Sequence, residues 1–283
     1  MEIKNPAIIG AGTMGSDIAL DLASYNYKVT LLDISTEALI KSKDKIEKGY
    51  NLAKMMKSTM RSITLEQIFE KINFTIDYED LKYADLVIEN VTEDFKTKKE
   101  VLSRATRYCQ PGAIFAINTS CISITKIASF LPEPQQVAGV HFMNPVPLKN
   151  IVETIRGYHT SDETIQTLGS FLKTVKKSQV VVKDYPGFVV NRLSHLFMNE
   201  AAYLVQDAVA EPKEIDILFE QGYGHKMGPL KTADLIGLDT VLHSLNVLYE
   251  SYQDPKFRSC PLLVKMVDAG LLGIKSGQGF YKY

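Results

Sequence analysis

The chain has 283 residues, 45% of them hydrophobic, which is enough for two globular domains with ordinary cores. Its 32 basic and 33 acidic residues give a formal net charge of −1, which argues against the broad positive surface of a nucleic-acid-binding protein. Three cysteines without a CxxC pair argue against a zinc site or a disulfide framework, and without a signal segment or an apolar stretch of ~18 residues we expect a cytoplasmic protein that does not bind membranes.

The first motif is the glycine-rich turn Gly-Ala-Gly-Thr-Met-Gly at 10–15, between an apolar run and a helix-like segment. In dinucleotide-binding folds the first glycine permits a tight turn and the second lets the backbone approach a pyrophosphate. The third lets the helix pack against the sheet, and the helix N-terminus attracts the phosphates. The pattern predicts a nucleotide site rather than an ordinary turn. Its predicted contacts are Gly10, Gly12, Thr13, Met14 and Gly15.

A second predicted strand, 28–32, ends in Asp33, eighteen residues after Gly15. A carboxylate there can accept hydrogen bonds from both ribose hydroxyls of NAD, whereas it would repel a 2′-phosphate. The residues that follow, 34–36, supply no arginine to offset that repulsion. The sequence therefore favours NAD over NADP. The alternative is an aspartate that only caps the next helix.

Further strands are predicted at 86–89, 114–118, 137–141, 151–156 and 179–182, in alternation with helices. This order is typical of a parallel, doubly wound Rossmann-like α/β sheet. The lysine-rich stretch 36–61 is predicted to project as a helical hairpin, with either a solvated face or a binding surface. Proline and glycine at 186–187 interrupt the pattern, and later segments have helical periodicity. We expect an NAD-binding domain over 1–186 and an all-α substrate and dimerisation domain over 187–283.

Two strand ends carry side chains suited to acid–base chemistry. His141 lies where a strand of an open α/β sheet points into the ligand crevice, and Glu153 follows within an apolar strand. A neutral imidazole can take a proton from an alcohol, and a carboxylate can orient the ring. Ser120, in Asn-Thr-Ser at 118–120, could hydrogen-bond a substrate oxygen. Each of these residues also has a structural alternative. His141 could be a histidine of the core, Glu153 a structural glutamate with a paired cation or donor, and Ser120 part of a turn that closes the strand.

Six motifs follow one another along almost the whole chain. They are the glycine-rich turn at 10–15, Asn-Thr-Ser at 118–120, His-Phe-Met-Asn-Pro-Val-Pro at 141–147, Pro-Gly-Phe-Val-Val-Asn-Arg at 186–192, Met-Gly-Pro at 227–229 and Gly-Gln-Gly-Phe-Tyr at 277–281. This order resembles the L-3-hydroxyacyl-CoA dehydrogenases, most closely the bacterial 3-hydroxybutyryl-CoA type. The resemblance implies an NAD-dependent oxidoreductase that interconverts 3-hydroxyacyl and 3-oxoacyl thioesters.

The resemblance also implies roles for individual residues. His141 would be the acid–base residue with Glu153 as its partner, and Ser120 and Asn191 would bind the substrate oxygen. The cofactor contacts that it implies are Glu93, Lys98, Ser120, Asn144 and Lys275, beside those of the glycine-rich turn and Asp33. The alternative is a homologue that binds NAD without catalysing a reaction. Such a protein would have no need of Ser120, His141, Glu153 and Asn191 together, so the sequence favours an enzyme.

The chain departs from the family at the hairpin, where relatives usually carry a lysine-rich tip that meets the CoA phosphates. Here Met55 and Met56 occupy the tip, which leaves Lys54 and Lys57 as candidate substrate contacts. Two substrates therefore stay open: an acyl-CoA thioester, or a thioester on an acyl carrier protein.

The predicted all-α domain carries much apolar sequence for its size, as at 235–242 and 245–248. A domain of under ~100 residues does not easily bury that much apolar surface within itself. We therefore expect a homodimer that forms mainly through residues 188–283, in agreement with the resembled family.

Overall fold

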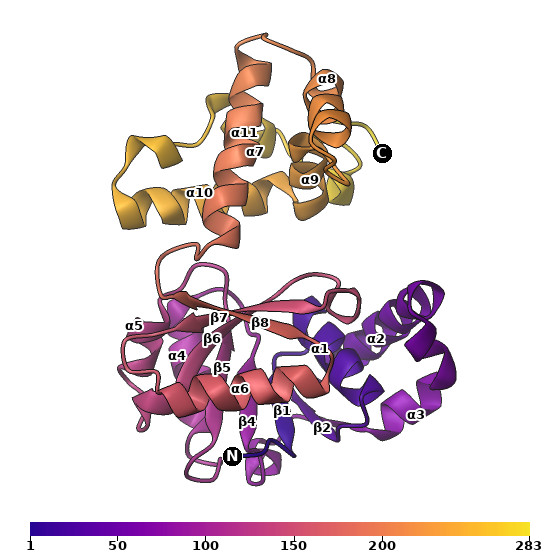
Figure 1. Ribbon diagram of the computed structural model, residues 1–283, viewed down its shortest axis with the longest axis vertical. Helices are drawn as coiled ribbons and strands as arrows, with labels where there is room; N and C mark the ends of the chain where they lie inside the picture. The colour runs from indigo at the N-terminus through magenta and orange to yellow at the C-terminus, as the bar shows by residue number, and fades with distance from the viewer. The chain divides into compact units, whose positions relative to one another are not determined.

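The structure, a computed structural model, describes residues 1–283 and divides into two units, Met1–Asp184 and Tyr185–Tyr283. The first unit contains an eight-stranded sheet with the order β3-β2-β1-β4-β5-β6-β7-β8 (Figure 1). The strands are β1 Pro6–Ile9, β2 Val29–Leu32, β3 Ile72–Thr75, β4 Leu86–Glu89, β5 Ile114–Asn118, β6 Val137–Phe142, β7 Ile151–Arg156 and β8 Ser178–Lys183.

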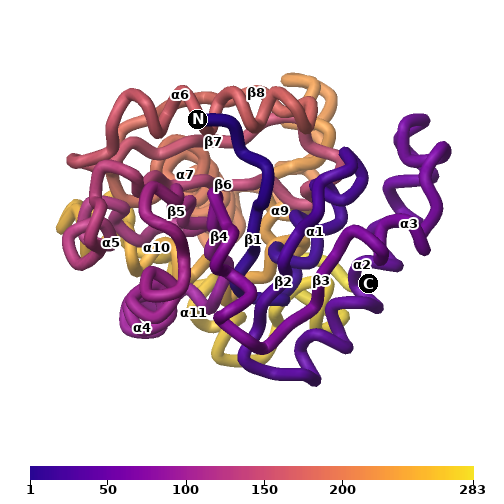
Figure 2. Tube along the Cα trace, turned by 90° about the horizontal axis from the view of Figure 1, so that it is seen from below, coloured from indigo at the N-terminus to yellow at the C-terminus, as the bar shows by residue number.

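Helices cover both faces of this sheet. They are α1 Thr13–Ser24, α2 Thr36–Met56, α3 Leu65–Glu70, α4 Phe95–Ala105, α5 Ile124–Ala128 and α6 Asp162–Thr174. Helices α1 and α6 share one apolar core with the sheet, and the views show α4 on the opposite face (Figures 1 and 2). Strands β2 and β3 are added on one side of β1, and β4 and those after it on the other, and the point at which this order reverses is where open α/β sheets bind ligands. The predicted doubly wound α/β fold is confirmed.

Two features of the sheet differ from the prediction. Strand β3 was not expected, and β7 runs antiparallel to β6, so β7 and β8 oppose the first six strands. The cause is the short connection from 143 to 150, because a parallel crossover requires a dozen or more residues. The antiparallel pairing sets His141 directly opposite Glu153 in register.

The lysine-rich stretch forms one long helix, α2, which begins where the Ser35 hydroxyl accepts a hydrogen bond from the Ala38 N–H at 3.2 Å. A 3-10 turn, η1 (Ser58–Ser62), and the short helix α3 return the chain to β3. Figure 2 shows α2 and α3 at the β3 end of the sheet, away from β7 and β8.

The second unit is entirely helical, as predicted. Its helices are α7 Val190–Gln206, α8 Pro212–Ile217, α9 Pro229–Ile236, α10 Leu238–Tyr252 and α11 Pro261–Asp268. Apolar side chains from α7, α9, α10 and α11 form its main core. None of the helices in either unit combines the length and the apolar character that a membrane span needs.

Two buried aspartates hold the C-terminal segment of this unit in place. Asp234 accepts hydrogen bonds from the Phe280 and Tyr281 N–H groups at 3.0 and 2.9 Å and from the Tyr283 hydroxyl at 3.1 Å. Asp216 accepts one from the Tyr281 hydroxyl at 2.7 Å. Burial raises the pKa of Asp234, and these donors oppose the increase.

We predict that Asp234→Ala lowers the free energy of unfolding by roughly 3 kcal/mol, because three donors lose a buried, charged acceptor. The matched control is Asp239→Ala, which breaks a half-exposed ion pair with Lys275 and should cost at most about 1 kcal/mol. Denaturant unfolding followed by circular dichroism measures both values, and equal losses would contradict the assigned role of Asp234.

Candidate functional site

The glycine-rich turn joins β1 to α1 and packs closely against its neighbours. A Cβ on Gly15 would lie 1.8 Å from the Gly10 carbonyl oxygen, whereas one on Gly12 would meet nothing within 4 Å. Gly12 precedes α1, and no side chain caps the helix. Its first N–H groups therefore remain available to an anion. Open space at Gly12 and uncapped donors fit the pyrophosphate of a dinucleotide.

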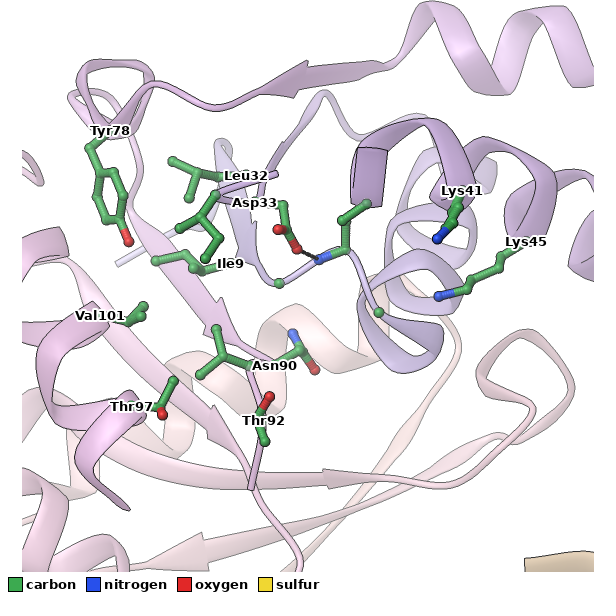
Figure 3. Close-up of a pocket in the computed structure, with 16 residues that line it drawn as sticks. Ile9, Leu32, Asp33, Lys41, Lys45, Tyr78, Asn90, Thr92, Thr97 and Val101 are labelled. Atoms are coloured by element: carbon green, nitrogen blue, oxygen red, sulfur yellow. Dashed lines mark hydrogen bonds between the residues drawn. The ribbon is translucent and has the colours of Figure 1, made fainter. Parts of the chain in front are cut away.

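Asp33 follows β2 and faces the same turn. Its Oδ2 accepts a hydrogen bond from the Ala11 N–H at 2.7 Å, and its Oδ1 accepts one from the Ser35 N–H at 3.1 Å. These bonds fix the carboxylate at the wall of a cavity of about 320 Å³, shown in Figure 3. The cavity lies at the switch point between β2, β1 and β4, which is the position expected for the adenosine half of NAD.

The cavity also contains residues that the sequence analysis did not select. Lys41 and Lys45 reach it from α2, and Asn90, Thr92 and Thr97 line it from the loop after β4 and from α4 (Figure 3). The spacing of the two lysines, four residues apart, places them on one helix face. That spacing was the one indication in the sequence that these lysines line a binding site, since a run of lysines usually indicates a solvated surface.

Lys98 and Glu93 belong to one network below this loop. The Lys98 ammonium is fully buried and binds both carboxylate oxygens of Glu89, at 3.0 and 2.9 Å, and the Asn118 carbonyl oxygen at 3.2 Å. It lies 3.6 Å from a Glu93 carboxylate oxygen. Burial raises the pKa of Glu89, and the Lys98 charge opposes that shift. Direct contact of Lys98 with the cofactor stays a prediction.

Glu93 holds the segment that carries Ser120. Its Oε1 accepts hydrogen bonds from the Thr119 hydroxyl at 2.5 Å and from the N–H groups of Ser120 and Cys121 at 2.8 and 3.1 Å. The Asn118 side-chain amide meanwhile donates to Asn90 Oδ1 at 2.7 Å. The segment after β5 is therefore tied to the loop that lines the cavity.

His141 and Glu153 face each other across β6 and β7, with His141 Nδ1 3.0 Å from Glu153 Oε2. Both side chains are largely buried, with 12% and 5% exposed. An ionised carboxylate can only accept, so Nδ1 carries the proton in this contact, and Nε2 is the ring nitrogen that can take up another. The structure thus brings together two residues that are twelve positions apart in sequence.

The remaining predicted residues have the following places. Thr13 and Met14 open α1, and Asn144 follows β6 in a cis peptide bond to Pro145. Lys54 and Lys57 lie at the end of α2. Asn191 and Lys275 belong to the second unit, where the Asn191 carbonyl accepts a hydrogen bond from His195 at 2.8 Å and Lys275 pairs with Asp239.

Comparison with known proteins assigns both units. Residues 5–185 match the NAD binding domain of 3-hydroxyacyl-CoA dehydrogenase, and residues 187–283 match its C-terminal domain. A probable 3-hydroxybutyryl-CoA dehydrogenase of Bacillus subtilis is 42% identical over 284 residues and covers 100% of this chain and 98% of its own. A 3-hydroxybutyryl-CoA dehydrogenase of Clostridioides difficile is 43% identical, with 98% of each chain covered.

The crystal structure of (S)-3-hydroxybutyryl-CoA dehydrogenase from Ralstonia eutropha is similar as well. It has a TM-score of 0.92 at 39% identity and covers 100% of this chain and 99% of its own. The match of residues 5–185 to an NAD binding domain confirms NAD as the cofactor predicted from the sequence.

We predict opposite defects for two alanine substitutions in the glycine-rich turn. Gly12→Ala should leave Tm within about 3 °C, because its methyl group has room, but weaken NADH binding ~10-fold by obstructing the phosphates. Gly15→Ala should lower Tm by several degrees, because its methyl group collides with the Gly10 carbonyl. Thermal melts and NADH fluorescence titrations measure both effects. Wild-type NADH affinity in Gly12→Ala would exclude this site.

Proposed function

This chain belongs to the 3-hydroxyacyl-CoA dehydrogenase family, as the order of its motifs predicted, and from that premise we propose that His141 and Glu153 form its catalytic acid–base pair. The reaction is the interconversion of 3-hydroxyacyl and 3-oxoacyl thioesters. The observation that carries the proposal is the 3.0 Å contact between His141 Nδ1 and Glu153 Oε2. We infer a short substrate of the 3-hydroxybutyryl type from the similar enzymes.

When bound, NAD supplies the hydride acceptor for oxidation, and NADH the donor for reduction. His141 takes the substrate hydroxyl proton at Nε2 during oxidation and returns it during reduction. Glu153 accepts a hydrogen bond from Nδ1–H and stabilises the positively charged ring. Because Glu153 is buried, little water screens this interaction. The contact therefore fixes the orientation of the ring and leaves Nε2 as the nitrogen that exchanges a proton with the substrate.

Ser120 and Asn191 would donate hydrogen bonds to the reacting oxygen. The three bonds from the Ser120 segment to Glu93 support this role, because a donor held in advance loses little freedom when the substrate binds. We assign the cofactor side to the glycine-rich turn and Asp33. Further contacts with NAD are proposed for Glu93, Lys98, Ser120, Asn144 and Lys275.

The thioester carrier has a second candidate, an acyl carrier protein, and the end of α2 favours it. Met55 and Met56 are 77% and 67% exposed, at the position where the family resemblance implies a lysine-rich tip that would meet the CoA phosphates. The Lys54 ammonium lies 5.3 Å from the Tyr50 ring centre, and the Lys57 charge acts on the buried Asp21 carboxylate. Lys54 thus already lies against an aromatic ring of its own helix.

We also propose a homodimer formed by the helical unit. Its surface exposes large apolar side chains that a single unit does not cover, among them Leu193, Leu218, Tyr223 and Leu235. Burial of such side chains between two copies would remove them from water, and closed two-fold pairing is the usual arrangement.

His141→Gln and Glu153→Gln should each lower kcat for acetoacetyl-CoA reduction by ~10²–10⁴-fold, the usual contribution of general acid–base catalysis. NADH affinity should stay near that of the wild type, and the double variant should lose little more than the worse single variant. His159→Gln, at an exposed position, is the matched control. Near-normal kcat in His141→Gln would refute the assignment.

For the carrier, we predict that KM for acetoacetyl-CoA exceeds KM for the same acyl group on a carrier protein by about 10-fold or more. The reason is that the end of α2, with Met55 and Met56, offers little positive charge to the CoA phosphates. Met55→Lys should lower KM for acetoacetyl-CoA and leave kcat unchanged. Steady-state kinetics with both substrates measure this. A low micromolar KM for acetoacetyl-CoA with no gain on the carrier protein would exclude the carrier-protein proposal.

For the assembly, light scattering at micromolar concentration should give twice the mass of one chain, because apolar burial between helical units drives association. Leu193→Asp and Leu235→Asp should shift that mass toward the monomer, whereas Lys82→Asp in the first unit should not. A fully active wild-type monomer would rule the dimer out.

A further inference from the structure

A buried lysine lies beside the connection between the two proposed catalytic strands. Lys177 stands between α6 and β8, and its side chain is 2% exposed. Its ammonium donates hydrogen bonds to the carbonyl oxygens of Val146 and Lys149, both at 2.8 Å. These two residues belong to the segment 143–150 that joins β6 to β7. Lys177 therefore holds this segment through two of its backbone carbonyl groups.

The counter-charge for Lys177 comes from the cofactor-binding helix. Its ammonium lies 2.9 Å from Asp21 Oδ2 on α1, and the Asp21 side chain is also 2% exposed. One turn earlier, Asp17 Oδ2 accepts a hydrogen bond from the Val146 N–H at 3.3 Å. Burial raises the pKa of both aspartates and lowers that of Lys177. The Val146 N–H opposes the shift of Asp17, and the attraction between Lys177 and Asp21 opposes the shifts of those two groups. The charges are retained inside the unit only because they are paired.

These contacts connect two parts of the site that are far apart in sequence. Helix α1 begins at the glycine-rich turn, and segment 143–150 lies between His141 and Glu153. Pairing of β6 and β7 with each other, and with β5 and β8, places the two strands of this β6–β7 hairpin. It leaves the position of the connecting segment 143–150 over α1 to other contacts. Asp17, Asp21 and Lys177 supply contacts of that kind.

We propose that Lys177, with Asp21 as its counter-ion, is a positioning residue that fixes the His141–Glu153 hairpin on the cofactor-binding helix. The inference rests on the proposed function of that pair. Lys177 itself need touch neither substrate nor cofactor. A displacement of about 1 Å between the acid–base pair and the reacting atoms can cost ~10²-fold in rate, so such an anchor affects turnover rather than binding.

The test uses Lys177→Met/Asp21→Asn, which removes the anchor without leaving an unpaired carboxylate at position 21. The control is Ile68→Ala, a fully buried core position on α3, which is outside both the connection and α1. Both variants should lose stability, but only the double variant should lose kcat per NADH-binding site, by about 10-fold or more, with NADH affinity within about 2-fold of wild type.

Hydrogen exchange provides a measurement that does not depend on activity. In the double variant, peptides covering 143–152 should exchange faster than in the wild type, by ~5-fold or more, while those covering 86–101 should not change. Asp17→Leu, which removes one bond and keeps the Lys177–Asp21 pair, should show a smaller effect in the same direction. If the double variant does not fold, Asp17→Leu still tests whether contacts with α1 hold the segment.

The outcomes separate this inference from the proposed function. Unchanged exchange at 143–152 overturns the anchor. Faster exchange with normal kcat overturns the positioning role and leaves a stabilising ion pair. Full activity in His141→Gln would instead refute the catalytic pair, and would remove the positioning role with it, while the exchange data would still decide whether Lys177 anchors the segment.

Discussion

The ion pair between Lys98 and Glu89 is the contact on which the carboxyl ends of β4 and β5 depend. Both side chains are fully buried, and either charge alone would cost several kcal/mol to remove from water. A buried ammonium also needs more than one acceptor, and Lys98 finds carbonyl oxygens at Val91 and Asn118. Helix α4 and the ends of β4 and β5 are therefore joined through one charged atom.

The same contact governs the segment that bears Ser120. Glu93 lies beside the Lys98 ammonium and receives three hydrogen bonds from residues 119–121. At the other end of this segment, Asp184 accepts bonds from the Ser123 hydroxyl and from the N–H groups of Ile124 and Thr125, at 2.9, 3.1 and 2.7 Å. Carboxylates thus replace regular secondary structure as the means of holding loops, since each can accept several donors.

Charged side chains serve the helical unit and the cofactor cavity in different ways. Asp216 and Asp234 in the helical unit are buried against backbone N–H groups and hold the C-terminal segment. The cofactor cavity instead keeps Lys41 and Lys45 at its wall, on the solvent side of α2. The lysines at the cavity wall are therefore available to a ligand, whereas the buried charges are taken up by partners within the protein.

The sequence by itself determined the features that depend on neighbouring residues. The glycine-rich turn, the strands apart from β3, the division into α/β and helical parts and the order of motifs all follow from local patterns. Only the tertiary structure decided which distant residues meet. The antiparallel register that sets His141 opposite Glu153, the burial of Lys98 and the pairing of Lys177 with Asp21 depend on how separate segments pack, because a charge enters a core only where another segment brings its partner.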